Sequence, residues 1–96
     1  MLDMVKTALR ISGDAFDDEI ELLIEACLDE MEGLGVVIEK DDAGDPKDAQ
    51  TQMAVIAYCK WQFGDHDNAE RWEKIYHTKL EQLKTMTGHT IWTQEA

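Results

Sequence analysis

The sequence has little positive charge for its length. Its 96 residues include 9 Lys and Arg side chains against 21 Asp and Glu, so the formal charge is −12. Binding to nucleic acid grows with the number of phosphates that Lys and Arg neutralise, and attraction to anionic lipid depends on the same side chains. The composition therefore argues against a free-standing DNA-binding domain and against an anionic membrane surface as partner. A chain this short forms one domain.

Nucleophiles and metal ligands are also scarce. Ser12 is the one serine, and no glycine-flanked elbow surrounds it. The histidines, His66, His77 and His89, stand eleven and twelve residues apart and lack the spacing of a metal site. The sequence therefore predicts that the chain is not an enzyme, with no catalytic residues, no cofactor and no metal.

Cysteines and long apolar runs are few. Cys27 and Cys59 lie inside apolar helical patterns without a CxxC motif, so we expect buried free thiols and no disulfide. The longest uncharged run covers residues 49–59. That is about half of the roughly 20 residues that a membrane-spanning helix needs. No membrane span is therefore expected.

Apolar residues recur every three or four positions along most of the chain, which predicts an all-α fold. We expect a small bundle of four main helices over residues 2–10, 15–34, 46–63 and 68–86, with a long loop at 35–47 between the second and third. Asp45-Pro46 predicts the N-cap and first turn of the third helix. This helix contains a continuous apolar run around Ile56, so we expect it to be central. Residues 1–86 form the predicted helical domain, and residues 87–96 an extended C-terminal arm.

Negative charge is concentrated in the first half of the chain. Residues 1–48 carry 15 acidic and 4 basic side chains, and no Lys or Arg occurs between Ile11 and Glu39. Four carboxylates of the second predicted helix define an acidic flank that we expect to face solvent or a channel: Glu21, Glu25, Asp29 and Glu32. A solubilising role for this face and a functional one are both open at this point.

Two segments are predicted to contact partners. The arm holds Thr90, Ile91, Trp92 and Thr93, which favour an extended strand and have no helical stripe to join. Strand addition to a partner, anchored by the indole, is the predicted role, with a frayed tail as the alternative. The unusual length of the loop suggests a second contact, at Asp41 and Asp42.

The order of these parts resembles the small head–tail connector (adaptor or head-completion) proteins of tailed bacteriophages. The likeness rests on a short opening helix closing on Leu9-Arg10-Ile11 and an acidic turn at Asp17-Asp18-Glu19. It continues with the second helix at residues 20–27, the acidic loop, and an Ala- and aromatic-rich third helix at residues 53–61. The resemblance covers about residues 2–85. Ser12 and Cys27 depart from the family's usual aspartate and alanine.

The resemblance implies a structural virion protein that forms a ring between the portal and the tail or stopper and extends the DNA channel. Its implied partners are the portal protein, the tail or stopper protein, further copies of itself in a ring with twelve-fold symmetry, and passing DNA that is not tightly held. The implied location is the virion, and the host cytoplasm during assembly. The alternatives are an acidic helical protein–protein interaction module or a DNA-mimic inhibitor.

Overall fold

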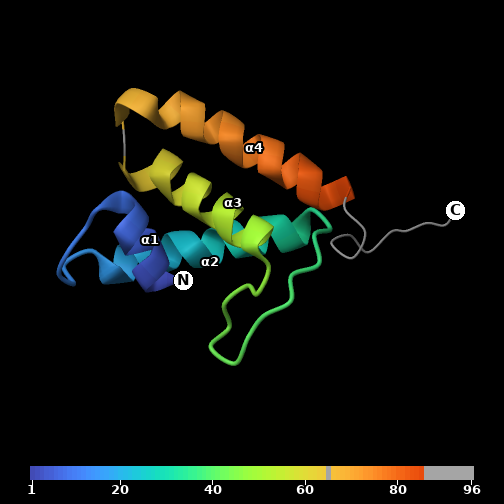
Figure 1. Cartoon of the computed structure of the whole chain (residues 1–96), viewed down its shortest axis with the longest axis horizontal. Coiled ribbons are helices and arrows are strands. Elements are labelled where there is room, and N and C mark those ends of the chain that lie inside the picture. The colour runs from blue at the N-terminus through green and yellow to red at the C-terminus, as the bar shows by residue number, and fades with distance from the viewer. Residues whose placement is uncertain (65, 86–96) are drawn as a thin grey trace, which may run out of the picture.

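The computed structural model describes residues 1–64 and 66–85, and this part of the chain is all-α (Figure 1). Four α-helices are present: α1 (Leu2–Leu9), α2 (Asp17–Gly33), α3 (Ala49–Cys59) and α4 (Ala69–Thr85). A π-helical turn, η1 (Lys60–Gly64), and a 3-10 turn, η2 (His66–Asn68), join α3 to α4. The predicted fold class is confirmed. The proposed arm at residues 87–96 lies outside the described residues.

The helix α3 lies at the centre of the bundle. It packs against α4 on one side and against α2 on the other, and α1 also contacts it. The side chains that α3 buries completely are small: Ala54, Val55, Ala57 and Cys59. Ile56, which the apolar run placed in the middle of the core, is only half-buried, and Met53 is 51% exposed. The helix is therefore central but keeps one strip on the surface.

The core side of α2 follows its apolar stripe. Ile20, Ile24, Cys27, Leu28 and Met31 are buried, as their spacing predicts. Phe16 and Leu34 extend the same three- and four-residue spacing to the ends of the predicted helix at 15–34. Each is 47% exposed because it lies just outside α2, where the periodicity no longer applies.

The start of α3 differs from the sequence prediction. Asp45 and Pro46 do not cap the helix, since Pro46 instead pairs with Lys40 in an isolated antiparallel bridge. The N-cap is Asp48, whose carboxylate accepts hydrogen bonds from the Thr51 amide at 2.9 Å and the Thr51 hydroxyl at 3.2 Å. Aspartate is favoured at the N-cap position because its carboxylate accepts a hydrogen bond from an otherwise unpaired amide of the first helical turn.

Aromatic rings connect the π-helical turn to α4. Tyr76 is fully buried, with its ring centroid 5.2 Å from Tyr58 and 6.1 Å from Trp61. The Tyr58–Tyr76 contact is edge-to-face, an arrangement that adds to the free energy gained by burying the rings. The Tyr76 hydroxyl also donates to a Glu30 carboxylate oxygen at 2.8 Å, which joins α4 to α2.

Candidate interaction surface

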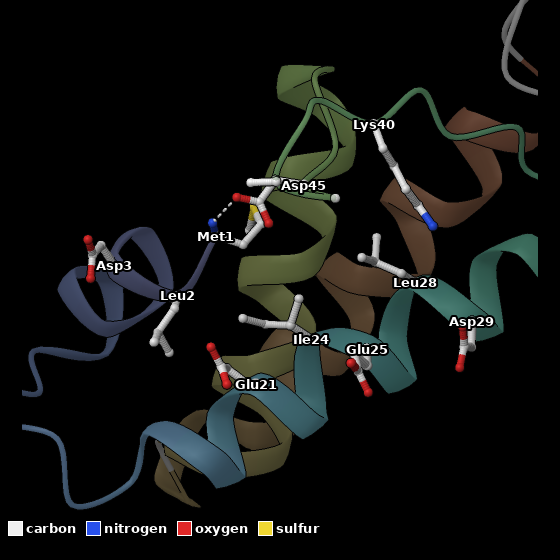
Figure 2. Close-up of a pocket in the computed structure, with 12 residues that line it drawn as sticks. Met1, Leu2, Asp3, Glu21, Ile24, Glu25, Leu28, Asp29, Lys40 and Asp45 are labelled. Atoms are coloured by element: carbon white, nitrogen blue, oxygen red, sulfur yellow. Dashed lines mark hydrogen bonds and ion pairs between the residues drawn. The ribbon is translucent and has the colours of Figure 1, made fainter.

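A hollow of about 740 Å³ lies between the start of the chain, α2 and the loop that precedes α3 (Figure 2). The α2 wall presents Glu21, Glu25 and Asp29 at four-residue intervals, beside the apolar side chains Ile24 and Leu28. Residues spaced in this way share one side of a helix. The hollow therefore has an apolar floor and a predominantly acidic rim.

Both cations at the hollow already have an acidic partner. The Met1 ammonium nitrogen lies 2.7 Å from an Asp45 carboxylate oxygen (Figure 2). The Lys40 ammonium nitrogen lies 3.2 Å from a Glu32 carboxylate oxygen. Within the described residues, Glu21, Glu25 and Asp29 have no cationic partner. The surface that they form consequently keeps its negative field.

The structure brings together all four residues of the predicted acidic flank. Glu21, Glu25, Asp29 and Glu32 are exposed along one side of α2. The first three line the hollow, while Glu32 contacts it through Lys40. The loop closes the other side of the hollow, which the sequence pattern alone did not indicate.

The two loop residues predicted to contact a partner differ in their surroundings. The Asp41 carboxylate accepts hydrogen bonds from the amides of Ala43 at 2.9 Å and Asp45 at 3.0 Å, and so it holds the loop's turn. Gly44 completes the turn with a φ of 86°, a conformation that glycine adopts without strain. Asp42 is exposed beside this turn. Asp41 thus shapes the loop, and Asp42 is the more available of the two for a contact.

The titratable groups in the core are protonated by burial. Burial raises the pKa of the Cys59 thiol to about 12, and burial together with the nearby Cys59 raises the pKa of Cys27 further. Burial also raises the pKa of the Tyr76 hydroxyl. A nucleophilic thiol needs the thiolate form, which burial disfavours at both cysteines. Both cysteines are free and buried, as predicted.

The remaining predicted features are reported for the described part of the chain alone. Thr90, Ile91, Trp92 and Thr93 lie outside it, so their role as a partner-binding strand stays a prediction. Residues 1–64 and 66–85 contain no group of three or more His, Cys, Asp or Glu side chains placed to hold a metal ion. No helix in the same ranges is long and apolar enough to cross a bilayer.

Together, the fold and the acidic surface define a small all-α protein that is suited to contacts with other macromolecules. A family model described as phage connector protein matches residues 1–90. The chain belongs to this phage connector family, as the order of its helices indicated, and membership indicates a structural virion protein. No curated protein and no solved structure matches the chain.

Proposed function

We propose that the protein forms a ring between the portal and the tail or stopper, and that the acidic flank of α2 faces the DNA channel of this ring. The proposed partners are the portal protein, the tail or stopper protein and further copies of the chain in twelve-fold arrangement. DNA passes along the acidic flank without being held. Family membership supports the connector role, and the uncompensated carboxylates of α2 support the channel-facing orientation.

One observation carries the orientation of α2. Glu21, Glu25 and Asp29 are exposed at successive turns with no cation beside them in the described structure. At a subunit contact these carboxylates would lose their hydration, at a cost in free energy, unless cations of the neighbouring copy faced them. Facing a channel, the carboxylates repel the DNA phosphates over a Debye length of about 8–10 Å. The repulsion keeps a moving polyanion from adhering to the wall.

Reversing the charge of the flank tests this orientation. We expect the Glu21→Lys/Glu25→Lys double variant to assemble on portal-bearing heads as the parent does, but to retain DNA, because two cations replace two carboxylates on the channel wall. Assembly is measured by electron microscopy and DNA retention by gel shift at two salt concentrations. The matched control is Glu70→Lys/Glu81→Lys, which changes the charge equally on exposed positions of α4. Failure of the flank variant to assemble, without any gain in DNA affinity, would place the acidic flank itself, rather than only the other side of α2, in a subunit contact.

The distribution of charge weakens the DNA-mimic alternative. A mimic of DNA needs carboxylates over most of its exterior. The helix α3 has no acidic residue between Ala49 and Cys59, although its outer strip reaches the surface at Met53. One side of the protein therefore lacks the phosphate-like charge that mimicry requires.

A further inference from the structure

The surface between α3 and α4 combines apolar side chains with lysines. Near one end of α3, the Lys79 ammonium donates to the Gln50 amide oxygen at 2.8 Å; near the other end, the Lys60 ammonium lies 4.4 Å from the ring centroid of Trp72. These two contacts mark the line along which the antiparallel helices meet (Figure 1). We call the exposed edge of this line the α3–α4 seam, formed by Met53, Lys60, Trp72, Ile75 and Lys79.

The seam is partly apolar and accessible. Met53 is 51% exposed, and Trp72 and Ile75 are half-buried. Tryptophan and other large apolar side chains that are half-buried in a monomer are frequent anchors of protein interfaces. The seam therefore offers an apolar centre to a partner.

The charge of the seam is opposite to that of the protein as a whole. The helix α3 contributes no acidic residue, while Lys60 and Lys79 border the apolar centre. Arg71 lies one turn before Ile75 on the same side of α4 and is exposed. The nearest acidic residues of α4 lie on its other edge, where Glu73 contacts His77 at 3.8 Å and His77 faces Trp61. A chain of net charge −12 thus has a local surface that carries only positive charge.

The outer side of α2 has the complementary character. Leu22 is 66% exposed in the second turn of α2. Asp18 lies one turn before it, Glu19 lies three residues before it, and Ala26 follows one turn later. We call these four residues the Leu22 patch. It lies beside the acidic flank of α2 but is distinct from it.

The seam and the Leu22 patch lie apart within one chain. The helix α3 is packed between α2 and α4, and Leu22 points away from the core that α2 shares with α3. A closed ring of identical subunits needs two unlike surfaces on each subunit, one for each neighbour. Such an interface usually has an apolar centre on both partners. Its rim carries charges of one sign on one partner and of the opposite sign on the other.

We infer that the Leu22 patch of one copy docks on the α3–α4 seam of the next copy. Leu22 packs against Met53 and Ile75, while Asp18 and Glu19 lie opposite Arg71, Lys60 and Lys79. The inference rests on the proposed ring and adds to it the two surfaces through which copies join.

Two variants that each disable one surface test this contact. Leu22→Asp removes the patch and Met53→Asp removes the apolar centre of the seam, both at positions exposed enough for the fold to tolerate the change. Each variant alone is expected to lose self-association by about 30-fold or more, the loss typical of an interface anchor. Mixed in equal amounts, they should form heterodimers and nothing larger, because one intact pair of surfaces remains. Sedimentation velocity measures both results, and circular dichroism checks the fold.

The control and the charge test use other exposed positions. Val37→Asp adds the same charge at an exposed apolar residue outside both surfaces and should self-associate as the parent does. Glu19→Arg and Arg71→Glu should each weaken association by about tenfold, and the double variant should recover it, since the two residues meet only between copies.

The outcomes separate this contact from the proposed ring. Undiminished association of either aspartate variant, or a mixture that forms no heterodimer, would overturn the contact. A parent chain that stays monomeric at the highest attainable concentration but docks on the portal would also overturn it and would leave the proposed function standing. A parent chain that neither self-associates nor docks would overturn both.

Discussion

The substitution Val55→Ala tests the central position of α3. Val55 is fully buried in that helix. Losing two buried methyl groups costs about 1.6 kcal/mol at ~0.8 kcal/mol each. A residual cavity of ~40 Å³ adds about 1 kcal/mol to this destabilisation, and the higher helix propensity of alanine offsets about 0.5 kcal/mol of it. The expected loss in the free energy of unfolding is therefore about 2 kcal/mol.

Met53→Ala in the same helix is the matched comparison. Met53 is half-exposed, so truncating its side chain to alanine removes little buried surface, and we expect a loss of about 0.5 kcal/mol or less. Urea denaturation followed by circular dichroism measures both values, and an unchanged m-value shows that the unfolded state is comparable. Equal losses for the two variants, or a loss below about 0.5 kcal/mol for Val55→Ala, would refute the placement of α3.

Three further predictions concern other parts of the chain. Asp48→Ala should destabilise the protein by about 1 kcal/mol in urea, since the first turn of α3 loses the cap on Thr51, and Asp48→Asn should restore most of it. The free energy of unfolding should fall as pH rises from about 8.5 to 10, because thiols of the unfolded chain ionise near pH 8.5 while the folded Cys59, with a pKa of about 12, keeps its proton. Cys59→Ala should reduce this dependence of the free energy of unfolding, measured in urea, on pH. Removal of residues 90–96 should leave helicity and melting unchanged and abolish docking to the portal; a truncated chain that docks fully would rule out the strand-addition role.

The sequence predicted the elements with regular periodicity well. The buried residues of α2 follow from the three- and four-residue spacing of Ile20 to Met31, because one helix face meets the core. The length of the apolar run in α3 indicated a central helix but not which side remained outside. That depends on where α4 packs, so the exposure of Met53 and the half-burial of Ile56 needed the tertiary structure.

The candidate surfaces were predicted less completely. The acidic flank follows directly from three- and four-residue spacing on one helix, and all four residues are exposed. The predicted N-cap of α3 was wrong because Asp45, Pro46 and Asp48 are all residue types that start helices. The choice between them depends on the pairing of Pro46 with Lys40, which the sequence does not indicate. The α3–α4 seam could not be predicted from the pattern of any single segment. Its residues come from two parts of the chain that the Lys60–Trp72 and Lys79–Gln50 contacts bring together.

The central position of α3 has a consequence for the order in which the protein folds during synthesis. The helices α1 and α2 contact α3 as well as each other, and α4 joins the bundle chiefly through α3. A nascent chain that ends before Ala49 therefore exposes the apolar side of α2 with little to cover it. It also carries nearly all of the excess negative charge, which opposes collapse. The N-terminal half should remain expanded on the ribosome until the residues of α3 have emerged, and stable structure should then form in a single late step.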